Sequence, residues 1–176
     1  HYLQTSSGTD SLTYLGNPSP NFIWSITNTF KYKNWDLTIF INGVSGNKIF
    51  NNTAVLLDKT NINIAHNTLT RFAYDNVDVA SYTPTVSSRY VESGAYARLS
   101  NVTLGYTFNL KSKLWVKRLR AYVTASNLCV ITKYSGYDPD VTASREFSSN
   151  GVNSFGIDNG NYPRPRTFLL GISATF

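Results

Sequence analysis

Cysteine, methionine and glutamate are nearly absent from this chain of 176 residues, and each absence excludes something. The single cysteine, Cys129, cannot form an internal disulfide and lacks a second thiol for a zinc site. The chain has no methionine and opens at His1, so we expect processing or truncation to have removed its true start. Two glutamates and one glutamine leave few strong helix formers, which argues against an all-helical protein.

Charged residues and long apolar runs are also scarce. Only 15% of the residues are charged, whereas 41% are hydrophobic and 14% aromatic, so the composition excludes disorder over the whole length. No apolar run approaches the roughly 18 residues of a membrane-spanning helix. That excludes spanning by helices but leaves spanning by strands open.

Neutral polar residues take the place of the missing charges. The chain has 19 Asn, 19 Thr and 19 Ser. Thr, Val, Ile and the aromatic residues favour strands, while Ser, Asn and Gly favour turns. The composition therefore predicts an all-β protein, and the length predicts one domain or one piece of a larger one.

Five segments alternate between apolar and polar residues, which predicts strands with two different faces. In each segment one face is apolar and the other carries mainly small, hydroxyl, amide or charged side chains. The five segments are residues 22–32, 35–42, 102–109, 119–126 and 168–176.

The connections between these segments alternate between short and long. Lys33 and Asn34 form a two-residue connection and 110–117 a short one, whereas about 46–94 and 134–166 are long. Transmembrane barrels alternate short periplasmic turns with long outer loops, and their strands point apolar residues outward. Soluble sandwiches have more even spacing. Five strands cannot close such a barrel, so we expect the chain to be part of one.

An ordered set of motifs resembles the C-terminal part of the SusC/RagA family of TonB-dependent outer-membrane transporters. The set runs from about Tyr14 to Phe176, in the order and at the spacing of that family. Its motifs are YLGNPSPN at 14–21, TNTFKYKNWDL at 27–37, YVESGAYARLSNVTLGY at 90–106, ASNL at 125–128, TKYSGYDPD at 132–140 and YPRPRTF at 162–168.

The resemblance implies antiparallel strands that form the C-terminal section of a large transmembrane β-barrel in the outer membrane of a Gram-negative bacterium. Residues 1–176 would be about five strands of that barrel, with extracellular loops at about 1–20, 47–93 and 134–166. The plug domain inside the barrel would be absent from this chain. Such transporters import oligomeric nutrients, either glycans or peptides, with a SusD-like surface lipoprotein as partner and energy delivered through the TonB complex.

The resemblance also implies roles for two sets of strand residues. The polar faces of two strands would line the lumen, at Asp36, Thr38, Phe40, Asn42, Arg120, Tyr122 and Thr124. The alternating apolar residues of the last strand would be the signal for the barrel-assembly machinery, at Phe168, Leu170, Ile172 and Phe176. An aromatic girdle residue is the simpler interpretation of Phe176.

Aromatic and acidic residues of the last long loop are the candidates for substrate binding. They are Tyr134, Tyr137, Asp138 and Tyr162. Pro139 follows Asp138 directly and favours a turn, so a structural role for this cluster is the more ordinary interpretation. Aromatic rings in such loops could stack on sugar rings or pack against a partner.

Other chemistries find little support. The histidines, His1 and His66, have no partners at metal-binding spacing, and no catalytic dyad or triad is present, so we expect no metal, cofactor or enzymatic activity. The net charge of +6 is concentrated at 111–120, which suits a turn beside anionic headgroups better than nucleic acid. The alternative to a transporter is a self-standing soluble β-sandwich that binds carbohydrate.

Overall fold

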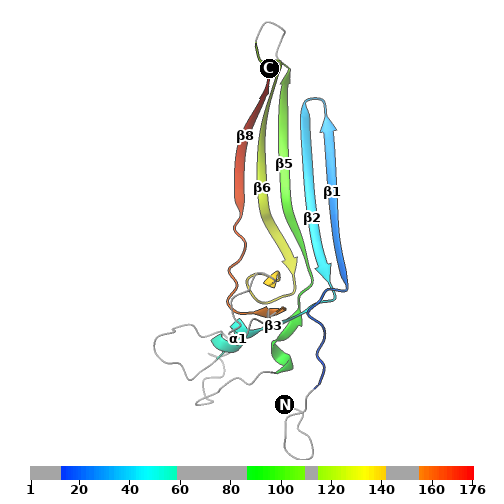
Figure 1. Cartoon of the computed structure of the whole chain (residues 1–176), viewed down its shortest axis with the longest axis vertical. Coiled ribbons are helices and arrows are strands. Elements are labelled where there is room, and N and C mark those ends of the chain that lie inside the picture. The colour runs from blue at the N-terminus through cyan, green and yellow to red at the C-terminus, as the bar shows by residue number, and fades with distance from the viewer. Residues whose placement is uncertain (1–12, 59–86, 110–114, 142–154) are drawn as a thin grey trace, which may run out of the picture.

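Five long strands form one antiparallel sheet in the computed structural model, which describes residues 13–58, 87–109, 115–141 and 155–176. The strand order is β1-β2-β5-β6-β8 (Figure 1). The strands overlap the five segments that alternate in the sequence, which confirms the all-β, antiparallel fold. Their bounds are Phe22–Tyr32 for β1, Trp35–Ser45 for β2, Tyr96–Asn109 for β5, Arg118–Thr132 for β6 and Thr167–Thr175 for β8.

The first hairpin closes with the two residues that separate β1 from β2. Tyr32 pairs with Trp35, so Lys33 and Asn34 form the whole turn. Lys33 has a φ of 52°, and such a positive φ is what two-residue hairpin turns require. The Asn34 carbonyl accepts a hydrogen bond from Thr107 N of β5 at 2.9 Å, which ties the turn to the next strand.

A β-bulge interrupts the pairing of the central strands. Leu99 pairs with Cys129 and Asn101 pairs with Ser126, so Ser100 lies opposite two residues of β6. One of those two, Asn127, has a φ of 55°, a conformation that asparagine tolerates better than most residues. The ASNL motif of the sequence is therefore the bulge. The same irregularity shifts β2 against β5, and it keeps Leu99 on the apolar face.

A second, smaller assembly lies at one end of the long sheet (Figure 1). It is a three-stranded sheet in the order β4-β3-β7, with β3 antiparallel to β4 and parallel to β7. Asn51 caps α1 by accepting a hydrogen bond from Ala54 N at 2.9 Å. Its elements are β3 (Lys48–Asn51), α1 (Asn52–Leu57), the 3-10 helix η1 (Ser88–Tyr90), β4 (Val91–Ser93) and β7 (Ile157–Asp158). We call this end of the molecule the loop end and the other end, with the 33–34 hairpin, the turn end.

Buried hydrophobic residues concentrate at the loop end. In the described part of the chain, Ile49, Tyr134 and Val141 pack together there, and Val55, Tyr90 and Tyr96 are also buried. Of these six, only Tyr96, the first residue of β5, belongs to the long sheet. None of the helices in the described ranges is both long enough and apolar enough to cross a membrane.

Candidate functional site

One face of the long sheet is apolar across all five strands. The register places Leu37, Leu104, Val123 and Leu170 side by side on β2, β5, β6 and β8. The edge strand β8 exposes this face strongly: Leu170 is 82% exposed and Ile172 is 75% exposed. In the described residues no second sheet covers it, although a soluble sandwich would bury such a face. The alternative of a self-standing sandwich therefore finds no support in the structure.

The opposite face is polar and carries the residues that the sequence assigns to the lumen. Two rows of paired residues cross β2, β5 and β6 on this face. One row is Asp36, Gly105 and Tyr122, and the other is Thr38, Thr103 and Thr124. Phe40 pairs with Asn101 and Asn42 with Arg98 on the same face. The role of this face as the lining of a lumen stays a prediction.

An ion pair crosses the polar face at Gly105. Arg120 donates from Nε to Asp36 Oδ1 at 3.0 Å and from a terminal nitrogen to Asp36 Oδ2 at 2.5 Å, in a bidentate arrangement. The two side chains come from β6 and β2, and β5 lies between them. A Cβ on Gly105 would stand 2.5 Å from the guanidinium and 2.6 Å from the carboxylate, so only glycine leaves room for the pair.

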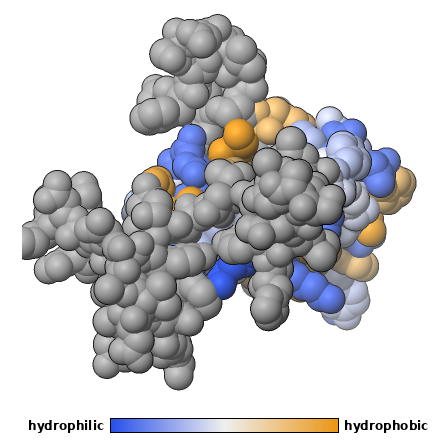
Figure 2. All heavy atoms as spheres, turned by 90° about the horizontal axis from the view of Figure 1, so that it is seen from below, coloured by the Kyte–Doolittle hydropathy of each residue, from blue (hydrophilic) through white to orange (hydrophobic). Residues whose placement is uncertain are grey.

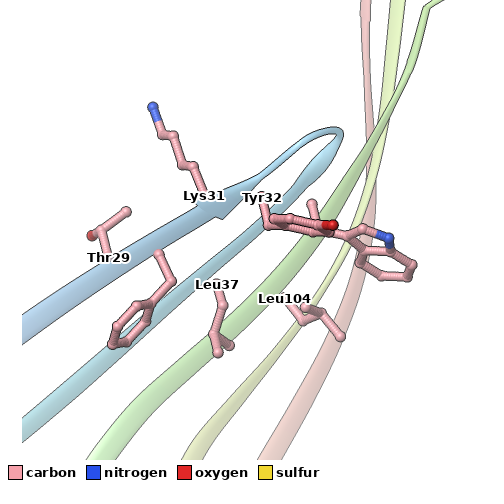
Figure 3. Close-up of a pocket in the computed structure, with 7 residues that line it drawn as sticks. Thr29, Lys31, Tyr32, Leu37 and Leu104 are labelled. Carbon is pink, nitrogen blue, oxygen red and sulfur yellow. The ribbon is translucent and has the colours of Figure 1, made fainter.

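A hollow of about 580 Å³ lies at the turn end of β1, β2 and β5. Figure 3 shows Leu37 and Leu104 pointing to one side of the sheet and Lys31 to the other. Tyr32 and Trp35, the pair that closes the hairpin, also line the hollow, and Trp35 packs edge-on against Tyr106 at 4.8 Å between ring centroids. Such aromatic residues at one end of an apolar face are typical of a membrane interface.

At the loop end, the segment after β6 contacts the polar face through a buried ion pair. Arg98 belongs to that face of β5, and its guanidinium donates to Asp138 Oδ1 at 2.6 Å; both residues are at least 95% buried. Burial alone would raise the pKa of Asp138. The hydrogen bond from Arg98 and those from the Asp140 and Arg164 backbone N–H groups outweigh burial, so the pKa lies below its usual range.

Tyr134 is a second buried anchor of the loop end. Its hydroxyl donates to Asp158 Oδ2, which joins the segment after β6 to β7. Burial raises the pKa of the Tyr134 hydroxyl above its usual value, and the hydrogen bond to Asp158 raises it further. Viewed from this end, hydrophilic and hydrophobic residues are both visible at the surface (Figure 2).

A pocket of about 520 Å³ opens at the loop end between α1, the η1–β4 segment and the turn after β6. Three charged side chains line it: Asp58, Arg89 and Glu92. Asp58 accepts a hydrogen bond from the Tyr90 hydroxyl at 3.0 Å and lies 3.9 Å from Arg89. The pocket is also lined by the polar residues Asn51, Thr53, Ser135 and Tyr137. This pocket is the candidate binding site of the described residues.

The four residues that the sequence singles out for substrate binding divide into two kinds. Tyr134 and Asp138 are buried, and their polar atoms are used within the protein. Tyr137 is 73% exposed at the pocket, and Tyr162 is 90% exposed outside its lining. No ligand contact tests any of the four, and only Tyr137 combines an exposed ring with a place in the pocket. His1 and His66 lie outside the described residues.

Sequence reasoning missed most of the pocket. Asn51 lies in the long connection 46–94, where no alternation marks a strand, and Glu92 lies in the 90–106 motif, in which no residue pattern marked a ligand site. Both side chains form hydrogen bonds with Ser135, which lies 43 residues after Glu92 and 84 residues after Asn51 in the sequence. Hydrophobic periodicity cannot reveal contacts between residues so far apart. One feature of the sequence could have pointed to Glu92: it is one of only two glutamates in the chain, and it lies in the YVES motif.

The chain is 30% identical over 169 residues to TonB-dependent receptor P3 of Formosa agariphila, an alignment that covers 92% of this chain and 17% of the relative. It is 27% identical over 172 residues to TonB-dependent receptor SusC of Bacteroides thetaiotaomicron, covering 90% of this chain and 15% of SusC. Its relatives are TonB-dependent receptors. The resemblance to SusC-type receptors drawn from the sequence is thereby confirmed.

Solved structures agree in fold. A chain of the RagAB peptide importer in its closed-closed state matches with a TM-score of 0.72 at 18% identity, over 99% of this chain and 20% of that chain. A RagAB peptide transporter structure matches with a TM-score of 0.68 at 20% identity, over 90% of this chain and 17% of that one. No protein-family model matches the chain. The chain thus spans about a sixth of the length of its relatives.

Proposed function

We propose that this chain is the C-terminal section of the outer-membrane β-barrel of a TonB-dependent transporter of the SusC/RagA type. The observation that carries the proposal is the long sheet itself, which is apolar on one face, polar on the other and, among the described residues, without a hydrophobic core of its own. A barrel wall needs this pattern, because one face meets lipid and the other meets water or a plug. Sequence relatives that are TonB-dependent receptors support it.

The two ends of the sheet then have different surroundings. The turn end, with the 33–34 hairpin and the C-terminal end of β8, faces the periplasm, and the loop end faces the outside. Exposed Trp115 and the basic residues Lys117 and Arg118 suit the periplasmic interface, where aromatic rings meet headgroups. The small assembly of β3, β4, β7 and α1 lies where an incoming nutrient first meets the barrel.

The partners follow from the same assignment. The edges of β1 and β8 pair with the remaining strands of the barrel, since an open edge is untenable in lipid. Asp36, Arg120 and Tyr122 face the plug, which TonB acts upon. A SusD-like lipoprotein covers the loop end. The exposed apolar residues Phe168, Leu170, Ile172 and Phe176 serve the barrel-assembly machinery as its recognition signal.

Deletion of the gene tests transport directly. The deletion strain is expected to lose growth on one class of oligomeric nutrient, glycan or peptide, and to keep growth on the matching monomers. The full-length gene restores growth, whereas a copy without the segment that contacts TonB does not. Unchanged growth of the deletion strain on every oligosaccharide and peptide offered would refute the assignment as a nutrient importer.

A further inference from the structure

Glu92 is a carboxylate held in a fixed orientation in the wall of the loop-end pocket. Its Oε1 accepts from Asn51 Nδ2 at 3.1 Å and from the Ser135 hydroxyl at 2.6 Å, and its Oε2 accepts from Ser135 N at 2.8 Å. All three donors are neutral. A carboxylate oriented by its neighbours loses little conformational freedom when it binds a ligand.

The charges around the pocket do not cancel. Asp58 has a guanidinium close by, that of Arg89, but in the described part of the chain no Lys, Arg or His forms a salt bridge with Glu92. Among the described residues, two carboxylates and one guanidinium line the cavity, so this part of the lining is acidic although the whole chain carries +6. The local field therefore favours a cation.

Tyr137 supplies the second element of a cation site. Its ring is 73% exposed, lies two residues after Ser135 and lines the same cavity. An aromatic face attracts an ammonium or guanidinium group and also packs against an aliphatic stem. The volume of about 520 Å³ lies within the usual range of small-ligand pockets, which is about 300–1,000 Å³.

We propose that this pocket binds a cationic group of a peptide substrate, either its amino terminus or a lysine or arginine side chain. Glu92 provides the counter-charge, and the Tyr137 ring covers the cation and its stem. The inference rests on the proposed function and deepens it, because it selects peptide over glycan. A neutral glycan would gain nothing from the uncompensated charge.

Binding to the purified full-length transporter in detergent tests the proposal. The probes are a fluorescent, capped peptide Ala-Ala-Lys-Ala-Ala, its isostere with norleucine in place of lysine, and a linear hexasaccharide as competitor. We expect the lysine probe to bind at least about fivefold more tightly than the norleucine probe, with the difference shrinking as salt is added.

Three variants assign the effect to the pocket. Glu92→Gln keeps an acceptor for Ser135 N and should remove the preference for lysine, and Arg89→Gln should increase it, because a competing cation is lost. Tyr137→Ala should weaken the lysine probe about threefold or more without a folding defect, since its ring is exposed. Tyr14→Ala, which removes a similarly exposed tyrosine outside the pocket, is the matched control.

The failure of this inference differs from failure of the proposed function. Equal binding of the two peptides, or an unaltered lysine preference in both Glu92→Gln and Tyr137→Ala, would overturn the cation site. So would a hexasaccharide that binds and displaces the lysine probe completely. Each of those results can occur in a protein that resides in the outer membrane and imports nutrients, so the transporter assignment would stand.

Discussion

Arg98 carries a buried charge that joins the long sheet to the loop end. Its charge is 98% buried on the polar face of β5, and Asp138 neutralises it at 2.6 Å. A buried charge that loses its partner is far more costly than an exposed one. The pair joins the wall of the sheet to the segment after β6, so its loss should release that segment locally rather than unfold the sheet.

Asp138→Asn is expected to lower the local unfolding free energy of the loop end by about 3 kcal/mol. Native-state hydrogen exchange of residues 134–141 in the full-length protein measures this. The matched control is Asp140→Asn, whose partner Arg164 is half exposed, and it should cost less than about 1 kcal/mol. Equal effects of the two substitutions would contradict a special role for the buried pair.

The loop end should also loosen in acid. The pKa of Asp138 is lower in the folded protein than in the unfolded chain, so its stabilisation is complete above the unfolded value of about 3.9 and is lost as the pH falls through the folded value. Exchange protection of residues 134–141, corrected for intrinsic rates, should stay constant from neutral pH to about pH 5 and fall below about pH 4. A fall that begins near pH 6 would assign the effect to another group.

Gly105 has a steric role that a substitution can isolate. Gly105→Ala places a Cβ against both members of the Asp36–Arg120 pair and should lower the stability of the barrel by about 1–3 kcal/mol in urea unfolding. In an Arg120→Ala background the same substitution should cost less, because no guanidinium has to move. An additive double mutant would show that the ion pair is not what excludes a side chain at this position.

At the scale of the elements, alternation explains why the five long strands could be predicted. Each strand is 9–15 residues long, and apolar and polar residues alternate along most of it. The strands β3, β4 and β7 have 4, 3 and 2 residues, too few for a period to be seen. Their pairing depends on hydrogen bonds and packing between segments that are distant in the sequence. The Arg98–Asp138 contact, which joins residues 40 positions apart, is another interaction of this kind.

The bulge was hidden for a related reason. A strict two-residue period through Leu99 and Asn101 places both on one face, yet the structure separates them by inserting Ser100. The ASNL motif is visible in the sequence, but nothing in the sequence shows that it forms a bulge. The conformation of Asn127 that makes the bulge is set by pairing between strands.

The two faces of β6 should respond oppositely to a charge. Val123 lies on the apolar face and its neighbour Thr124 on the polar face, beside Thr103 and Leu169. Val123→Arg should destabilise the membrane-inserted barrel by about 2–4 kcal/mol if it lies near the bilayer midplane, whereas Thr124→Arg should cost much less. The folded fraction, read from heat-dependent mobility in gel electrophoresis, compares them. A larger defect in Thr124→Arg would reverse the assignment of lipid and lumen faces.

At the scale of the whole molecule, the chain makes sense as one section of a larger protein. In the part of the chain that the structure describes, no hydrophobic core covers the long sheet, and the relatives are TonB-dependent receptors about six times the length of this chain. The described residues form a long sheet and, at the loop end, a small folded assembly with a pocket. In the proposed transporter, the plug would belong to the remainder of the protein and the lid to its lipoprotein partner.

The most direct test of the account is the mass and location of the native polypeptide that contains residues 162–176. An antibody against that segment, applied to fractionated source cells, measures both at once. The account predicts a single band several times heavier than 19.6 kDa, confined to the outer membrane. A soluble band of 19.6 kDa would contradict it and restore the carbohydrate-binding sandwich as the explanation.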